Sequence, residues 1–294
     1  MISFVGAGPG AADLITLRGA ARLAAADVVI WASSLVPEGI LEHCRAGSTI
    51  LDSSTMTLED VLGIYDANPE AATVRLHSGD PAIFGAIQEQ IDWCVAHERS
   101  FEVIPGVTSL SAAAATLGRE LTIPTISQSV VLTRVPGRTS ASMPESETLA
   151  GFAAHGCTMA IFLSASKPRD LQAQLLAPES AFDLDTPAAI VVRASWPDER
   201  VVRTTLGRLA EDIEATKEKR TVLVLVGPAL SEVGARSHLY SPRFSHHFRL
   251  RSHDGSTTGR PSRNQRPSPA APSTQGEANR REGENAASTG PRGN

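Results

Sequence analysis

The hydrophobic positions in the first 118 residues form short apolar runs that alternate with longer amphipathic stretches. The short runs predict strands, and the longer stretches predict helices with one apolar face. We expect strands at 2–5, 28–31, 49–51, 73–77 and 101–104, and helices at about 16–25, 37–44, 57–67, 84–97 and 111–117. Five successive β-α steps favour right-handed crossovers and a mainly parallel sheet.

Local signals add detail to these helices. Thr57 and Asp60 have the spacing of a capping box, and Gly118 is typical of the residue after a helix end. The helix expected at 84–97 has an apolar stripe that we expect to pack on the sheet. The stripe consists of Ile87, Ile91, Cys94 and Val95.

The second half of the chain predicts another α/β series. We expect strands at 130–133, 159–163, 188–192, 201–205 and 222–226, and helices at 168–176 and 206–216. The strand at 201–205 follows Trp196-Pro197-Asp198 directly, which indicates a hairpin and therefore a mixed sheet. The sequence thus predicts two α/β domains, at 1–120 and 121–235, with a ligand cleft between them.

Composition and charge separate this folded part from a tail. Ten of the 27 basic residues but four of the 32 acidic residues lie between Arg236 and Asn294, so that segment carries +6 and residues 1–235 carry −11. After Leu250 there is no large apolar side chain. We therefore expect a tail at 236–294 that is disordered after about residue 253, because it buries too little area to offset its chain entropy.

Other bulk features favour a soluble cytoplasmic protein. No apolar run reaches the length of a membrane span, and a strand follows Met1 without a charged leader. Cys44, Cys94 and Cys157 are odd in number and lack metal-ligand spacing. They predict buried thiols in a reducing compartment and no metal site.

Three glycine-rich loops each follow a predicted strand. They are Gly6-Ala7-Gly8-Pro9-Gly10, the segment 78–85, and Pro105-Gly106-Val107-Thr108-Ser109. Such loops lie at the carboxyl edge of a parallel sheet, where open α/β proteins bind ligands. Glycine lets the backbone approach a ligand closely, so the pattern favours a nucleotide-like cofactor.

The first loop also fits a relaxed dinucleotide fingerprint, since Gly6, Gly8 and Ala11 are spaced as Gly-x-Gly-x-x-Ala after a strand. Two features oppose that interpretation. Trp31 stands near the position where an acidic residue would bind the ribose. Pro9 removes a backbone N–H from the turn that would hold the pyrophosphate.

The three loops in this order resemble the tetrapyrrole methylase family. The resemblance includes Asp13-Leu14-Ile15-Thr16 and Gly79-Asp80-Pro81, and it extends from Ile2 to about Val226. It implies S-adenosylmethionine as the methyl donor, two α/β domains with the donor in the cleft between them, and a homodimer. No Ser-His-Asp or paired-carboxylate arrangement stands out, which agrees with transfer of an activated methyl group that depends on alignment.

Correspondence with the family places nine residues at the methyl donor. They are Pro9, Ser78, Gly79, Asp80, Ile83, Thr108, Ser109, Leu163 and Ala194. Asp80 and His77 are the candidates for a catalytic group. The alternatives are that Asp80, Thr108 and Ser109 cap helices and that His77 is a hydrogen-bonded core histidine.

Further segments resemble one branch of this family, which methylates ring carbon 11 of precorrin-4 to give precorrin-5 in cobalamin biosynthesis. They are 32–37, 56–59, 119–124, 127–128, 132–134, 137–139 and 158–164. Trp31 departs from this branch, in which a Tyr precedes Ala-Ser-Ser. The Arg-rich tail also lies outside the family pattern.

The substrate of that reaction carries acetate and propionate chains, so we expect cations beside it. Arg134 and Arg138 flank a loop where guanidinium groups suit carboxylates. Ser33 and Ser34 are expected to hydrogen-bond the macrocycle or to cap the helix near Pro37. Further cation candidates are Arg18, Arg119 and Arg193.

Three other functions remain open from the sequence. They are methylation of another ring carbon of a tetrapyrrole, a nicotinamide-dependent oxidoreductase, and a regulatory module that holds the cofactor without turnover. We expect a small-molecule tetrapyrrole as the partner, with neither nucleic acid nor a membrane.

Overall fold

The computed structural model describes residues 1–135, 143–231, 233–241 and 244. Met1–Arg236 form one compact unit that holds two five-stranded sheets. Ser237–Asn294 form a second unit, whose described part contains the 3-10 helix His238–Tyr240. Arg138 and the tail after residue 253 lie outside the described residues.

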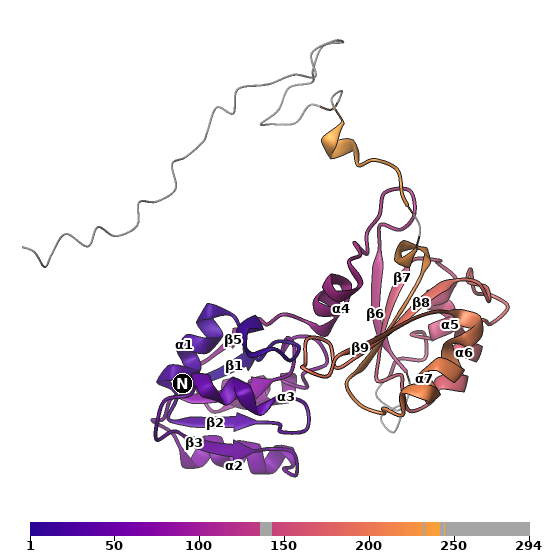
Figure 1. Cartoon of the computed structure of the whole chain (residues 1–294). Helices are drawn as coiled ribbons and strands as arrows, with labels where there is room; N and C mark the ends of the chain where they lie inside the picture. The colour runs from indigo at the N-terminus through magenta and orange to yellow at the C-terminus, as the bar shows by residue number, and fades with distance from the viewer. Residues whose placement is uncertain (136–142, 232, 242–243, 245–294) are drawn as a thin grey trace, which may run out of the picture. The chain divides into compact units, whose positions relative to one another are not determined.

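The first sheet is parallel throughout, as the alternation of elements predicts, and its strand order is β3-β2-β4-β1-β5. Its strands are β1 (Ile2–Gly6), β2 (Val28–Trp31), β3 (Thr49–Asp52), β4 (Thr73–His77) and β5 (Phe101–Ile104). Its helices are α1 (Leu17–Ala25), α2 (Leu58–Ala67) and α3 (Gln88–Ala96). Strands β3, β2, β1 and β5 are labelled in Figure 1. Apolar clusters on both faces bury the central strands, with α1 on one face and α2 and α3 on the other. The capping box of Thr57 and Asp60 is present at the start of α2.

Three expectations for this half were wrong. The helix expected at 37–44 is a 3-10 helix, Glu38–His43, which is short and contains Gly39, a poor α-helix former. Helix α3 begins only at Gln88, because Phe84 and Ala86 have positive φ angles of 57° and 49° that an α-helix does not contain. Val95 is 65% exposed, since α3 turns Cys94 to the core instead.

The second sheet is mixed, with strand order β6-β7-β10-β8-β9. Its strands are β6 (Val130–Arg134), β7 (Thr158–Phe162), β8 (Pro187–Val192), β9 (Arg200–Thr205) and β10 (Val222–Val226). Strands β6 and β7 run parallel, and the other neighbours are antiparallel, including the predicted hairpin of β8 and β9. One face packs on α5 (Leu149–Ala153), α6 (Pro168–Leu175) and α7 (Leu209–Thr216). The sequence analysis did not predict α5.

Helix α4 (Ser109–Leu117) covers the other face of the second sheet, although it follows the last strand of the first sheet. Ala112, Ala113 and Leu117 pack there against β7, β8 and β10. The helix ends at Gly118, which has the positive φ angle of 61° expected of a C-terminal glycine. The domain boundary near residue 120 remains a prediction. Helix α4 connects the first sheet to the second, because it follows β5 and packs on the second sheet.

Candidate functional site

The three glycine-rich loops meet backbone to backbone at the carboxyl edge of the first sheet. The N–H of Gly79 donates to the carbonyl oxygen of Gly8 at 2.8 Å, and the N–H of Gly8 donates to that of Gly79 at 3.3 Å. A Cβ on Gly106 would lie 2.1 Å from the Gly79 oxygen and 2.8 Å from the Cα of Gly6. The close approach of these loops therefore requires glycine at residue 106.

The carboxylate of Asp80 fastens two of these loops together. Its Oδ1 accepts the N–H of Ala82 at 2.8 Å, and its Oδ2 accepts the N–H of Gly106 at 2.9 Å. The interpretation of Asp80 as a helix cap was wrong, because a turn follows Pro81 and α3 starts at Gln88. Asp80 positions the loops, with one N–H on each carboxylate oxygen.

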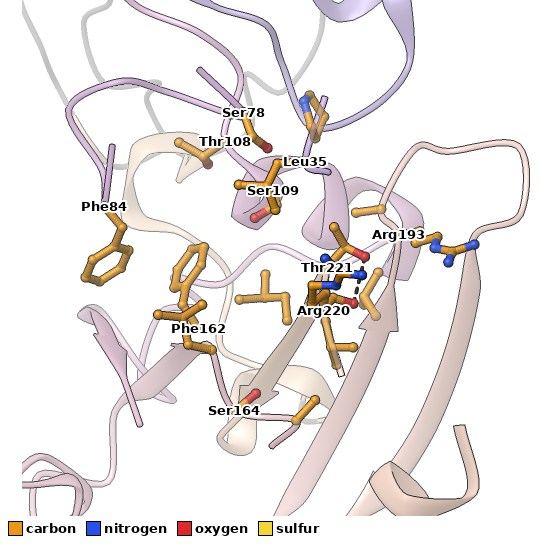
Figure 2. A pocket seen from close by; sticks show the side chains of 18 of the residues that line it. Leu35, Ser78, Phe84, Thr108, Ser109, Phe162, Ser164, Arg193, Arg220 and Thr221 are labelled. Carbon is orange, nitrogen blue, oxygen red and sulfur yellow. Dashed lines mark hydrogen bonds between the residues drawn. The ribbon is translucent and has the colours of Figure 1, made fainter. Parts of the chain in front are cut away.

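A cavity of about 330 Å³ lies over this junction and reaches the second sheet. All nine residues expected at the methyl donor line it, brought together from both halves of the chain (Figure 2). The other lining residues are Leu35, Phe84, Phe162, Ser164, Ala165, Val191, Arg193, Trp196, Lys219, Arg220, Thr221, Val222 and Leu223. The volume lies within the range of sites for small molecules.

The walls of the cavity differ in chemistry. Phe84 and Phe162 form an aromatic pair with ring centroids 5.1 Å apart, and Figure 2 shows them across the view from Arg220. Thr108 accepts the N–H of Ser111 at 3.3 Å and so caps α4, while its side chain also lines the cavity. The buried Oγ of Ser164 has no hydrogen-bond partner among the described residues. A buried hydroxyl without a partner at a cavity wall is suited to a polar ligand atom.

Backbone strain is concentrated at this cavity. Among the described residues, nine non-glycine residues have positive φ angles, and four of them line the cavity. These are Phe84, Leu163, Arg193 and Thr221, with φ between 52° and 57°. Such conformations cost free energy, and they cluster at functional sites where the surrounding structure holds them.

Residues 1–210 match the family of tetrapyrrole (corrin/porphyrin) methylases. The chain belongs to this family. A curated relative from Sinorhizobium sp, named precorrin-4 C(11)-methyltransferase, is 45% identical to this methylase over 253 residues, which cover 85% of this chain and 98% of the relative.

Two solved structures have similar folds. The structure of a cobalt precorrin-4 methyltransferase has a TM-score of 0.74 and 39% identity, and the match covers 79% of this methylase and 96% of that chain. A uroporphyrin-III C-methyl transferase from Thermus thermophilus, complexed with S-adenyl homocysteine, has a TM-score of 0.65 and 25% identity. That match covers 78% of this methylase and 98% of that chain.

Several candidate residues of this methylase lie away from the cavity. His77 is buried at the end of β4, and its Nε2 has no hydrogen-bond partner among the described residues. Burial, with the nearby Arg75 charge, lowers the pKa of His77 to about 3. His77 therefore stays neutral near pH 7, and it is not among the described residues that line the cavity.

The substrate candidates are scattered. The N–H and Oγ of Ser33 donate to Asp52 at 3.1 and 2.6 Å, and no side chain caps the 3-10 helix after Pro37, so the capping alternative for Ser33 and Ser34 was wrong. Arg134 ends β6 outside the described cavity lining. Of the further cations, Arg18 is exposed on α1, and Arg119 donates twice to the carbonyl oxygen of Ala229. Arg193 alone of these arginines is among the described lining residues.

Sequence reasoning missed the aromatic pair and the segment 219–221. The only available signal for that segment was its position directly before the strand at 222–226. Its basic residues were indistinguishable by sequence from solvated surface charges.

Proposed function

We propose that this methylase transfers the methyl group of S-adenosylmethionine to ring carbon 11 of precorrin-4, or of its cobalt form, and gives precorrin-5 in cobalamin biosynthesis. The observation that carries this proposal is the near full-length similarity to a relative named for that activity. The three loops also lie within residues 1–210, which match the family of tetrapyrrole methylases.

The cavity residues fit S-adenosylmethionine. The hydroxyls of Ser78, Thr108 and Ser109, with the N-terminal end of α4, suit the methionyl carboxylate, because a helix N-terminus stabilises negative charge. Ile83 and Leu163 suit the adenine, and Leu163 is 64% exposed, so it has apolar surface available to a ligand. When bound, the donor supplies a sulfonium-activated methyl group.

The residues of this chain act mainly by alignment. Asp80 is held by two N–H groups, and neutral His77 lies outside the described lining, so we assign no proton transfer to either. A methyl group that is already activated needs the acceptor carbon in line at near-attack distance. Orientation of this kind accounts for about 7–11 kcal/mol of barrier lowering in model reactions.

A nicotinamide-dependent oxidoreductase is disfavoured by the first loop. After Ala11 the chain enters the 3-10 helix Ala12–Leu14, and α1 begins only at Leu17. A dinucleotide site places the pyrophosphate on the N-terminus of the helix that directly follows the loop.

We also propose that the protein is a homodimer, which the family resemblance implies, and that it is cytoplasmic. Cys44, Cys94 and Cys157 are free, as in a reducing compartment, although only Cys94 is fully buried. The described helices include none able to span a membrane. In the described ranges no three potential ligands cluster for a metal ion. Light scattering at micromolar concentration tests the dimer, which a monomer mass would contradict.

Incubation with methyl-labelled S-adenosylmethionine and precorrin-4, in metal-free and cobalt forms, tests the activity. We expect NMR to place the label at ring carbon 11. Label at another ring carbon would identify a different tetrapyrrole methyltransferase. Cofactor binding without any transfer would indicate the regulatory module.

A further inference from the structure

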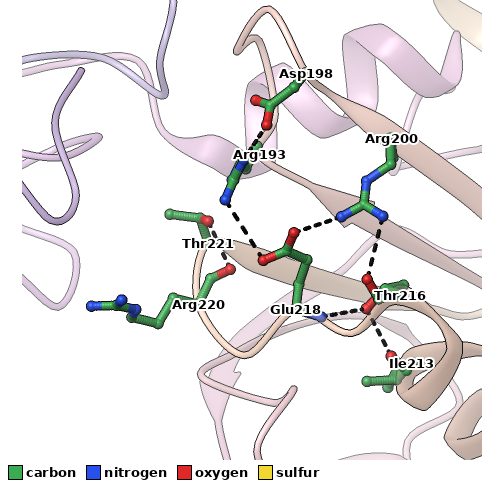
Figure 3. Close-up of polar contacts among 8 residues, drawn as sticks. All are labelled: Arg193, Asp198, Arg200, Ile213, Thr216, Glu218, Arg220 and Thr221. Carbon is green, nitrogen blue, oxygen red and sulfur yellow. Dashed lines mark hydrogen bonds and ion pairs between the residues drawn. The ribbon is translucent and has the colours of Figure 1, made fainter. Parts of the chain in front are cut away.

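Three cationic side chains are among the described residues that line the cavity, and one of them is already neutralised. The Arg193 guanidinium pairs with Asp198, and its other nitrogen lies 3.7 Å from Glu218 (Figure 3). Glu218 also pairs with Arg200 at 2.7 Å. Arg193 therefore belongs to a network of two arginines and two carboxylates.

The other two cations, Lys219 and Arg220, follow Glu218 in the sequence, and the carboxylate of Glu218 is engaged in the same network. Glu218 directly precedes Lys219 and Arg220, but its backbone N–H donates to Thr216 and its carboxylate is turned to Arg193 and Arg200. Figure 3 shows the Arg220 side chain extending away from Glu218. Neither Lys219 nor Arg220 has an acidic partner among the described residues.

The segment that carries them is held in place. Thr221 has a φ angle of 53°, and its carbonyl oxygen accepts the N–H of Arg193 at 2.8 Å. Asp80, the acidic residue in the described lining, has both oxygens occupied by backbone N–H groups. An anionic ligand thus meets two exposed cationic side chains beside an anchored backbone, on a body that carries −11 in residues 1–235.

We propose that Arg220, assisted by Lys219, binds a carboxylate of the tetrapyrrole substrate at this side of the cavity. The inference rests on the proposed function and names its specificity-determining cation. A guanidinium binds a carboxylate through two parallel N–H···O bonds, which fixes orientation as well as charge. The methyl donor also carries a carboxylate, but the hydroxyls and helix N-terminus at Ser78, Thr108 and Ser109 already suit it.

Equilibrium binding separates the two carboxylates without turnover. The probes are uroporphyrin III, a stable tetrapyrrole with acetate and propionate chains, followed by fluorescence quenching, and S-adenosylhomocysteine, followed by calorimetry. We expect Arg220→Gln to raise the Kd for uroporphyrin by about tenfold and to leave the Kd for S-adenosylhomocysteine unchanged. Arg220→Lys should recover part of the loss, and added salt should weaken uroporphyrin binding more in the wild type than in Arg220→Gln.

Lys217→Gln is the matched control, because it removes the same charge three residues away, outside the described lining. An equal effect of Lys217→Gln, or an unchanged Kd for uroporphyrin in Arg220→Gln, would overturn the inference. A higher Kd for S-adenosylhomocysteine alone would assign Arg220 to the donor instead. Failure of the wild type to methylate any tetrapyrrole would refute the proposed function separately, since the binding results do not depend on turnover.

Discussion

The indole N–H of Trp196 donates to the carbonyl oxygen of Pro9 at 3.0 Å. The bond joins the turn between β8 and β9 to the first glycine-rich loop, 187 positions away in the chain. The ring also fills the space beside that loop, since a Cβ on Gly10 would lie 2.2 Å from it. A second link supports it, because Ser195 Oγ accepts the N–H of Ala11 at 3.0 Å.

Trp196→Phe should weaken cofactor binding while the fold is kept. The substitution removes the hydrogen bond to Pro9 but retains an aromatic ring at the cavity. We expect the Kd for S-adenosylhomocysteine to rise about fivefold, equivalent to about 1 kcal/mol. Calorimetry measures it, with Trp93→Phe on α3 as a control that should leave the Kd unchanged. Equal Kd values for Trp196→Phe and the wild type would show that this bond does not shape the site.

Gly106→Ala should disrupt the junction of the three loops. The new Cβ would lie 2.1 Å from the carbonyl oxygen of Gly79 and 2.8 Å from the Cα of Gly6. Both contacted atoms belong to the backbone, so they cannot rotate away. We expect a loss of about 3 kcal/mol in the free energy of unfolding, measured by urea denaturation. In Gly63→Ala the new Cβ has nothing within 4 Å, and the helix should gain up to about 1 kcal/mol. Two variants of equal stability would contradict this account of the junction.

Asp80→Asn tests whether Asp80 positions the loops or takes part in proton transfer. An amide has one acceptor oxygen, so either the Ala82 or the Gly106 N–H would face an NH₂ group. We expect the Kd for S-adenosylhomocysteine to rise about tenfold, because a partly buried N–H loses its partner. A variant with unchanged Kd and a kcat lowered more than about a hundredfold would instead identify Asp80 as an acid or base.

His77 should make the protein less stable in acid. Its pKa of about 3 lies below the usual 6.5 because the ring is buried. Between these values the unfolded chain binds a proton that the folded chain excludes, so stability falls as pH falls below about 6.5. At pH 5 the loss from this group is about 2 kcal/mol relative to pH 7.

His77→Phe should remove that dependence. Urea denaturation at pH 7 and pH 5 gives the difference in unfolding free energy between the wild type and the variant. We expect the unfolding free energy of the variant, relative to that of the wild type, to be about 2 kcal/mol higher at pH 5 than at pH 7. Parallel pH profiles would show that His77 takes up a proton without unfolding.

Strands were predictable from sequence because buried central strands show as short runs rich in β-branched and other apolar residues, in the parallel β4 as in the antiparallel β10. Both β4 and β10 were predicted with the observed bounds, and β10 is buried at all five positions. Periodicity failed where a single backbone conformation decided the outcome. Phe84 belongs to an apolar pattern typical of a helix, yet its φ angle of 57° is incompatible with an α-helix, and α3 begins only at Gln88.

The site was predictable as far as it is made of local motifs. The loops around Pro9, Gly79 and Thr108 carry their own signature, and the structure brings them into one cavity. Arg220 carries no local signature. Its place depends on the pairing of Glu218 with Arg193 and Arg200, which only the fold brings together.

Helix α4 carries Thr108 and Ser109 at the cavity and packs its alanine face on the second sheet. Its far end is fixed as well, since the Arg203 guanidinium on β9 donates to the carbonyl oxygen of Leu117 at 2.7 Å. One residue inserted or deleted between Thr108 and Ala112 would turn the helix by about 100° and shift it by about 1.5 Å. The hydroxyls could then no longer line the cavity while the alanine face packs on the second sheet. The segment therefore tolerates changes of side chain far better than changes of length.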